Sequence, residues 1–285
     1  MKQAAYIVNT GIITAIGNDT AACLDALLHS RTGVGTAEYL KTHWSGELPV
    51  AEVKASNNAL AAIAGVDAKW PRTAILSAIA VKEAMQPVAD KLQGLKVGFF
   101  SATTVGGMDL TENVYKEFKE DSSKVDFDNI KNHECGTITE LVANHFGISD
   151  FVTTISTACS SSANSIMMAA QMIGNGMLDV AIAGGADSLS RFTLNGFNTL
   201  MILDKQPCQP FDNNRRGLNL GEGAGYLLLM SEKAMQQCGA TADCKVSGYT
   251  NANDAYHQTA SSPDGTGNKL AMGNALKGAN LQPAD

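Results

Sequence analysis

A cysteine at a strand-to-helix junction is the residue of this sequence best placed to act as a nucleophile. Cys159 follows the apolar, β-branched run 152–157 and precedes three serines, 160–162, that open a stretch of helical period. Backbone N–H groups and the positive end of the helix dipole favour a thiolate over a thiol at such a position, and they can also bind an oxyanion. The pattern indicates nucleophilic chemistry at Cys159, and the alternative is an ordinary buried cysteine.

The segment that leads into the apolar run 226–230 carries alternate glycines at 221, 223 and 225. Glycines there let two backbones approach closely before a buried strand. A phosphate-binding loop is not indicated, because its glycines would follow a strand and open a helix. The charged residues of the same segment, Asp212, Arg215 and Glu222, predict a buried ion-pair and hydrogen-bond set rather than acid/base catalysts.

The elements that position these residues follow from the hydrophobic pattern. Apolar runs of strand length alternate with stretches of helical period, which is typical of βαβ units and predicts an α/β fold with a largely parallel, buried sheet. The Ala-Gly-Gly-Ala-Asp run at 183–187 predicts a tight turn after one strand. The expected strands are 4–8, 95–101, 152–157, 180–184, 226–230 and 245–249. The expected helices are 20–30, 71–92, 136–146, 160–173 and 232–238, with a further helical stretch at 269–278, and the polar segments 40–58 and 120–132 are expected to leave the sheet.

Charge and composition exclude several classes of partner. The 285 residues carry a formal net charge of −7 without a cluster of Lys or Arg, so neither nucleic acid nor an anionic membrane is expected as the main partner. Lys69, Arg72 and Lys205 are scattered candidates for a basic patch that would bind an acidic carrier. With no apolar stretch near 18 residues and no signal peptide, we expect a soluble cytoplasmic protein. The six cysteines have no paired spacing, so neither a zinc site nor a redox dithiol is indicated.

Five segments, in the same order along the chain, resemble the thiolase-fold condensing enzymes, specifically the β-ketoacyl-[acyl-carrier-protein] synthases of the I/II type. They are 8–17, the Thr-Ala-Cys-Ser-Ser run 157–161, 183–187, the segment 210–225 that begins Pro-Phe-Asp, and the Asp-Ala-Tyr-His run 254–257. The resemblance implies a layered αβαβα fold, of which this chain would hold the N-terminal half and the start of the second. It divides the chain into residues 1–243, with the nucleophile, and 244–285.

The chemistry implied by the resemblance is a decarboxylative Claisen condensation by covalent catalysis. The acyl group would pass from the phosphopantetheine of acyl carrier protein to Cys159, and a malonyl thioester would then lose carbon dioxide and attack the acyl-enzyme. By the same resemblance, Phe197 and Met108 would line the acyl channel and Thr259 would lie at the pantetheine entrance; plain core packing is the alternative for all three. No cofactor or metal is implied, and a homodimer is expected with the strand 152–157 near its two-fold axis.

Departures from the family pattern are also informative. Arg216 stands where the family usually has Asp, and Asp204 and Lys205 replace a Ser-Thr pair, which points to a specialised branch such as synthases of polyenes. The family's second half bears two catalytic histidines, and the five histidines here match none of their positions. A truncated synthase, crippled in condensation, is therefore expected. The alternatives are a non-catalytic partner resembling chain-length factors, which generally lack the cysteine, and a thiolase acting on coenzyme A esters.

Overall fold

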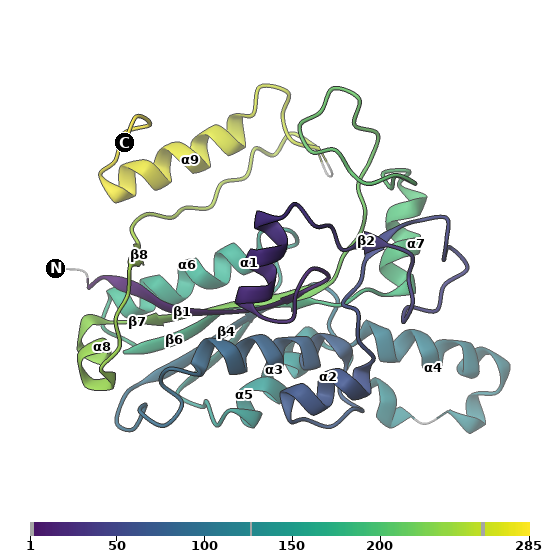
Figure 1. The fold of residues 1–285 in the computed structure, drawn as a ribbon, viewed down its shortest axis with the longest axis horizontal. Coiled ribbons are helices and arrows are strands. Elements are labelled where there is room, and N and C mark those ends of the chain that lie inside the picture. The colour runs from purple at the N-terminus through teal and green to yellow at the C-terminus, as the bar shows by residue number, and fades with distance from the viewer. Residues whose placement is uncertain (1–2, 126, 258–259) are drawn as a thin grey trace.

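A mixed sheet runs through the middle of the molecule in a computed structural model, which describes residues 3–125, 127–257 and 260–285 (Figure 1). The strand order is β5-β4-β6-β7-β1-β8. The strands are β1 Ala5–Thr14, β4 Val97–Ala102, β5 Phe151–Ile155, β6 Val180–Asp187, β7 Gly223–Met230 and β8 Cys244–Val246, and a separate ladder pairs β2 Val34–Gly35 with β3 Val50–Ala51.

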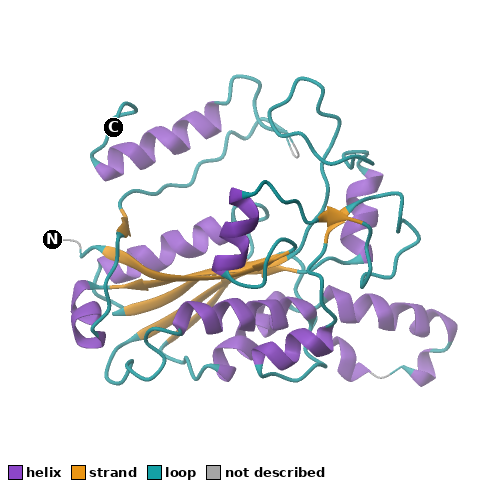
Figure 2. Cartoon of the chain, in the orientation of Figure 1, coloured by secondary structure: helices purple, strands orange, loops and turns teal. Residues whose placement is uncertain are grey.

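Helices cover both faces of this sheet (Figure 2). α3 and α5 pack on one face and α6 packs on the other, so the α/β prediction is confirmed as three layers in the order helix, sheet, helix. The helices are α1 Thr20–Leu28, α2 Asn57–Ala64, α3 Arg72–Met85, α4 Met108–Glu120, α5 Cys135–His145, α6 Ser161–Gly174, α7 Arg191–Thr199, α8 Glu232–Cys238 and α9 Thr266–Ala279, with 3-10 turns η1 Ser122–Lys124 and η2 Phe127–Ile130.

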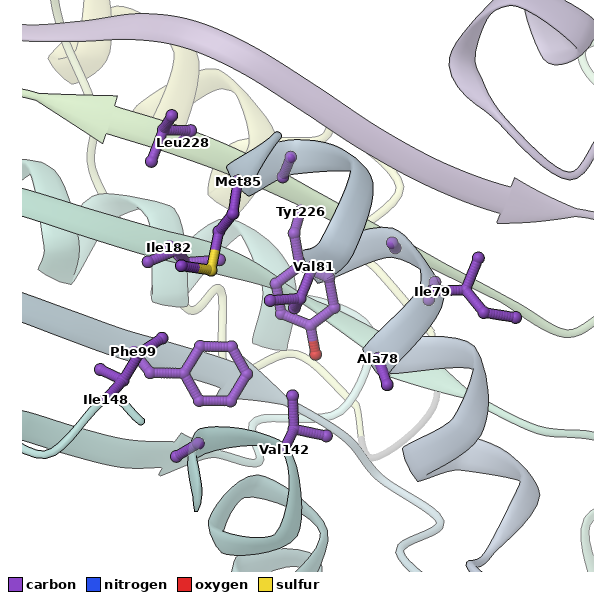
Figure 3. Packing of buried hydrophobic residues seen from close by; sticks show 14 of the residues in the cluster. Ala78, Ile79, Val81, Met85, Phe99, Val142, Ile148, Ile182, Tyr226 and Leu228 are labelled. Carbon is purple, nitrogen blue, oxygen red and sulfur yellow. The ribbon is translucent and has the colours of Figure 1, made fainter. Parts of the chain in front are cut away.

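The larger hydrophobic cluster fills the space between α3 and the sheet (Figure 3). Tyr226 of β7 is buried there, and its ring stacks on that of Phe99 with 5.7 Å between the centroids. The Tyr226 hydroxyl lies 3.0 Å from the Ser77 hydroxyl and 2.7 Å from that of Ser101. The two serines supply the hydrogen bonds that a buried phenol needs, and burial raises the pKa of Tyr226 to about 12. The smaller cluster lies under α6, on the opposite face.

β1 continues six residues beyond the predicted strand 4–8. The sequence Asn-Thr-Gly that follows resembles a turn, but tertiary contacts keep it extended. A Cβ on Gly11 would lie 1.9 Å from the Ala80 carbonyl oxygen, so only glycine lets α3 approach this closely. The Glu83 carboxylate of α3 accepts hydrogen bonds of 2.8 Å from the N–H groups of both Ile12 and Thr20, which ties β1 and the start of α1 to α3.

The sheet is mixed, and the prediction of a largely parallel sheet is wrong for its second half. β4 pairs in parallel with β5 and β6, whereas β7 pairs antiparallel with β6 and β1, and β1 pairs antiparallel with β8. The connection from β6 to β7 passes through α7 and a long loop, which returns the chain in the opposite direction. Apolar runs report burial on both faces but not strand direction, so the hydrophobic pattern could not distinguish the two arrangements.

Helix bounds differ from the prediction where solvent exposure or proline intervenes. α3 ends at Met85 rather than at 92, because Pro87 cannot continue a helix. α2, α4 and α7 were missed. Polar residues make up much of α4 and α7, and each of these two helices buries one residue, Val114 and Leu194 respectively. In the described part of the chain, no helix is both long and apolar enough to cross a bilayer.

Candidate active site

Cys159 lies on a turn between the end of β5 and the start of α6, where the sequence placed it, and its side chain is exposed. Ala158, which precedes it, has a φ of +53°, a left-handed conformation that is uncommon for a residue with a side chain. The buried Ser161 hydroxyl stabilises this turn from the inside. It accepts a hydrogen bond of 2.7 Å from the Thr157 N–H and donates one of 2.6 Å to the Ala158 carbonyl.

The first turn of α6 supplies backbone donors beside the thiol. The Ser161 N–H donates to the Ala158 carbonyl and the Asn164 N–H donates to the Ser160 carbonyl. Within the described residues, the N–H groups of Ser162 and Ala163 have no hydrogen-bond acceptor. Unpaired N–H groups at a helix N-terminus stabilise negative charge, so this end of α6 can support an oxyanion that forms next to Cys159.

A cavity of about 340 Å³ opens at Cys159. Its walls are made by the ends of four strands together with the nucleophile turn, and most lining side chains are small. The lining residues are Ile12, Thr14, Ala102, Thr103, Thr104, Ala158, Cys159, Ser161, Ser162, Gly185, Ala186, Asp187, Gly223, Ala224 and Gly225.

Glycines of β6 create room for this cavity and for the neighbouring strand. A Cβ on Gly184 would lie 2.0 Å from the Gly225 carbonyl oxygen of β7, and one on Gly185 would lie 2.5 Å from the Ser162 Oγ. The segment 183–187 is therefore not a tight turn, as its sequence suggested, because β6 stays extended to Asp187. Its glycines permit close packing rather than a reversal of the chain.

Asp187 is the one carboxylate among the described residues that line this cavity. Its oxygens accept hydrogen bonds from the Thr103 hydroxyl at 2.7 Å, the Thr104 N–H at 2.8 Å and the Thr104 hydroxyl at 2.6 Å. These three donors occupy the oxygens of the carboxylate and hold it against the end of β4. The same described lining includes no histidine. The segment of Asp187 stood out in the sequence, but this carboxylate did not. Its threonine partners are more than 80 residues away in the chain, so no local pattern indicates the contact.

The predicted substrate-binding residues do not join Cys159 in this cavity. Met108 is the first residue of α4 and Phe197 lies in α7; both are half-buried, and neither is among the lining residues. Thr259 lies outside the described residues. The role of all three in substrate binding remains a prediction.

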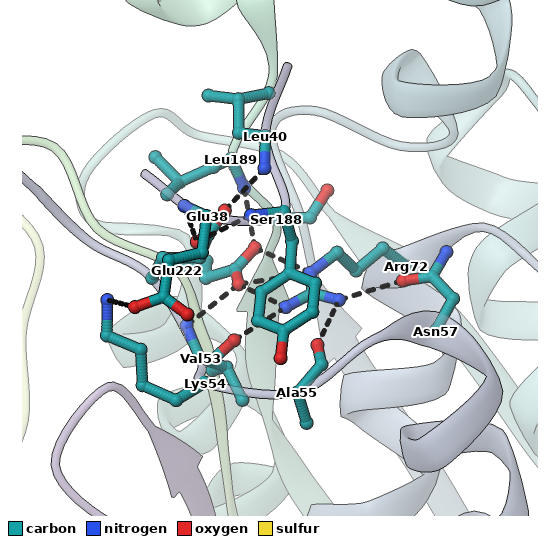
Figure 4. Close-up of polar contacts among 12 residues, drawn as sticks. Glu38, Leu40, Val53, Lys54, Ala55, Asn57, Arg72, Ser188, Leu189 and Glu222 are labelled. Atoms are coloured by element: carbon teal, nitrogen blue, oxygen red, sulfur yellow. Dashed lines mark hydrogen bonds and ion pairs between the residues drawn. The ribbon is translucent and has the colours of Figure 1, made fainter. Parts of the chain in front are cut away.

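A second cavity, of about 270 Å³, has several charged groups in its lining, and Figure 4 shows the hydrogen bonds and ion pairs around Arg72 and Glu222. Glu222 is buried in it and pairs with Arg72 of α3, not with Arg215 as the sequence suggested; the shortest distance between the two charged groups is 2.6 Å. Glu222 also accepts hydrogen bonds from the N–H groups of Val53 at 2.9 Å and Leu189 at 3.0 Å. Arg215 is exposed, as is Asp212.

All five N–H groups of the Arg72 guanidinium have acceptors. Besides Glu222, they donate to the Val53 carbonyl at 3.0 Å, the Ala55 carbonyl at 3.0 Å and the Asn57 side chain at 2.8 Å. Arg72 is 7% exposed, so it cannot contribute to a basic docking patch on the surface, contrary to the suggestion from the sequence. We call the side chains around Arg72, Glu222 and Asp109 the Arg72 cluster.

Asp109 borders the same cavity and is incompletely paired. Its Oδ2 accepts a hydrogen bond of 3.0 Å from the backbone N–H of Arg72, while its buried Oδ1 has no partner among the described residues. Burial, with a smaller contribution from the nearby Glu112 carboxylate, raises the pKa of Asp109 to about 6.

Comparisons with known proteins identify the family of this chain. Residues 4–234, which include the nucleophile turn and both cavities, match the family described as "Beta-ketoacyl synthase, N-terminal domain". Nodulation protein E of Rhizobium meliloti (strain 1021) is 29% identical over 295 residues, an alignment that covers 100% of this chain and 71% of that protein. 3-oxoacyl-[acyl-carrier-protein] synthase 2 of Staphylococcus aureus (strain N315) is 28% identical over 300 residues, covering 100% of this chain and 72% of that protein.

A solved structure gives the same result for the fold. A ketosynthase in complex with its chain length factor, from Xenorhabdus doucetiae, superimposes with a TM-score of 0.82 at 26% identity. The superposition covers 99% of this chain and 69% of that one.

Proposed function

The chain belongs to the β-ketoacyl synthase family, and on that premise we propose that it transfers an acyl group from a carrier-protein thioester to Cys159. The observation that supports this most strongly is the exposed Cys159 thiol, held on a strained turn at the N-terminus of α6 and facing a cavity. The substrate would arrive on the phosphopantetheine arm of acyl carrier protein. We place the reaction in the cytoplasm, where the six free cysteines would stay reduced.

The transfer uses the geometry of the turn directly. The Cys159 thiol gives its proton to solvent, its sulfur attacks the carbonyl carbon of the thioester, and the carbonyl oxygen gains negative charge as the tetrahedral intermediate forms. The N–H groups of Ser162 and Ala163 lie at the end of α6 where such charge is stabilised. The bond from the carbonyl carbon to the pantetheine sulfur then breaks, and the pantetheine thiol leaves with a proton from solvent. The small side chains of the cavity leave room for the thioester.

Condensation requires a second step, and the one carboxylate in the described lining of the Cys159 cavity, Asp187, already binds three donors. Decarboxylation of a malonyl thioester generates a carbanion, and no histidine among the described residues lines the Cys159 cavity to assist it. We propose that these 285 residues alone stop at the acyl-enzyme. The Cys159 setting argues for acyl transfer over the role of a non-catalytic partner, although a relative from Xenorhabdus doucetiae is a ketosynthase in complex with such a factor.

Pairing of two copies is proposed through β5. This strand is at one edge of the sheet, where it pairs with β4 alone among the described strands, and its Val152 is 36% exposed. An edge strand with free backbone groups can extend a sheet across a two-fold axis. Such pairing would place two nucleophile turns near the same interface, because β5 leads directly into each turn.

The test is intact mass of the purified chain after incubation with an acyl-acyl carrier protein thioester, followed by peptide mapping. We expect one acyl addition, on the Cys159 peptide, and none in Cys159→Ala. Cys208 and Cys244 are also exposed, so they report non-specific acylation in the same sample, and Cys208→Ala is the matched control that should be acylated normally. Equal acylation of all exposed cysteines, or acylation by acetoacetyl coenzyme A in preference to the carrier-bound thioester, would overturn the proposal.

A further inference from the structure

A chain of solvent-exposed hydrogen bonds also joins the residues of the nucleophile turn. The Asn164 Nδ2 lies 2.7 Å from the Thr157 Oγ1 and 3.3 Å from the Ser160 Oγ, and the Thr157 and Ser160 hydroxyls are 3.1 Å apart. The Ser160 hydroxyl lies 2.9 Å from the Thr157 carbonyl oxygen. At its other end, the Asn164 Oδ1 lies 2.8 Å from the Asn251 Nδ2.

The direction of every bond in this chain follows from the proton count. A carbonyl oxygen only accepts, so the single hydroxyl proton of Ser160 goes to the Thr157 carbonyl. Because the Ser160 proton is used in that bond, the Thr157 hydroxyl must donate to the Ser160 oxygen. The Thr157 oxygen can therefore only accept from Asn164, and this fixes the Asn164 amide with Nδ2 toward the turn. Its Oδ1 then points outward and accepts from Asn251.

The turn is thus held on two sides that differ in origin. Ser161, on the inner side, is buried and belongs to the turn itself. Asn164 is half-buried on the first turn of α6, and its Oδ1 is held by Asn251, which is 87 residues away on the exposed segment after β8. A change in that segment would reach Cys159 through the amide of Asn164, because Thr157 and Ser160 immediately flank Ala158 and Cys159.

We propose that Asn164 is a positioning residue for Cys159 and that Asn251 holds its amide in place from outside the turn. The inference rests on the proposed function in taking Cys159 as the nucleophile. It adds that the reactivity of this thiol is coupled to the segment that follows β8. Residues that act through a shared hydrogen-bond chain have non-additive effects, whereas independent supports contribute additively.

The experiment is a double-mutant cycle read by iodoacetamide on the full chain. Peptide mapping gives the alkylation rate of Cys159 relative to that of Cys208 in the same sample, for wild type, Asn164→Leu, Asn251→Leu and the double variant. Leu is close to Asn in size but cannot hydrogen-bond. We expect Asn164→Leu to lower the relative rate roughly tenfold. Asn251→Leu should lower it about threefold when introduced into the wild type, and should cause no further loss when introduced into the Asn164→Leu variant.

Two controls separate positioning from loss of the fold. Cys23 and Cys238 are buried, so they should stay unmodified in every folded variant. Asn164→Gln retains an amide and should recover part of the relative rate. An unchanged rate in Asn164→Leu, or the same loss from Asn251→Leu in both backgrounds, would overturn the inference. Because alkylation needs no carrier protein, failure of acyl transfer in wild type would count against the proposed function and leave this result readable.

Discussion

The Cys159 cavity and the Arg72 cluster are neighbours in the sequence and opposites in construction. Gly223 lines the Cys159 cavity and Glu222 belongs to the Arg72 cluster. Asp187, the last residue of β6, lines the Cys159 cavity, while Leu189, two residues later, lines the cavity of the Arg72 cluster. The space of the Cys159 cavity is left open mainly by residues without a large side chain, such as Gly185. The Arg72 cluster is a buried ion pair whose guanidinium has every N–H group occupied.

The difference shows that a dense set of charged groups is not by itself a sign of chemistry. In the Arg72 cluster, the charged groups bind one another and the backbone of the surrounding loops. In the Cys159 cavity, the thiol is exposed and the only carboxylate of the described lining is occupied by three donors. Mutations in the Arg72 cluster should therefore change the stability of the fold, and mutations at the Cys159 cavity should change the reactivity of the thiol.

Removing one charge of the Arg72 cluster is expected to have the largest effect on stability. Glu222→Gln leaves the Arg72 guanidinium buried without a counter-charge, and breaking such a pair costs about 3–5 kcal/mol. Urea denaturation should show that loss as a lower midpoint. Glu222→Gln matches the shape of the native side chain, so a loss below about 1 kcal/mol would mean that the cluster contributes little to the fold. Asp212→Asn, at an exposed carboxylate of the same segment, is the control and should be neutral.

Asp109 should make the stability of the same cluster depend on pH. Its pKa in the folded protein, about 6, lies above the usual 3.8, so its stabilising contribution is complete below about pH 4 and is lost as the pH rises through 6. The shift corresponds to roughly 3 kcal/mol. Between pH 4 and pH 7, the free energy of unfolding of Asp109→Asn should therefore rise relative to wild type by up to that amount. A difference that is constant over this range would contradict the assignment.

Filling the Cys159 cavity should have the smallest effect on stability and a clear effect on the thiol. A Cβ at Gly185 would lie 2.5 Å from the Ser162 Oγ and 2.6 Å from the Ala102 carbonyl oxygen, so Gly185→Ala should cost about 1–3 kcal/mol. The shift of Ser162 should also slow alkylation of Cys159. Gly136→Ala is the matched control, because a Cβ there meets nothing within 4 Å, and it should leave both quantities unchanged or slightly raise stability.

Sequence reasoning predicted the nucleophile turn because its determinants are local. The strand, Cys159 and the helix lie within 25 consecutive residues, and the hydrophobic period together with the serines reported their order. α8 was predicted with its observed bounds for the same reason: the Ser231 hydroxyl accepts from the Ala234 N–H, and Gly239 ends the helix with a φ of +62°. Each of these signals is contained in one element.

The Arg72 cluster could not be predicted in the same way. Arg72 and Glu222 are 150 residues apart, and Glu222 had nearer basic residues, such as Arg215, that proved to be exposed. The extension of β1 past residue 8 likewise depends on Glu83 and Ala80 of α3, which a local pattern does not report. The antiparallel direction of β7 has no signature in an apolar run.

The place of β7 in the sheet has a consequence for biosynthesis. β7 lies between β1 and β6, and Tyr6 of β1 pairs with Met230, 224 residues later in the chain. At roughly 5–20 residues per second, a ribosome needs on the order of 10–45 s to supply that partner. For this time β1 is made but lacks its β7 partner, which favours slow folding and association of nascent chains. The speed of translation, and chaperones that cover the first strand, should therefore govern how much of this protein reaches its folded state.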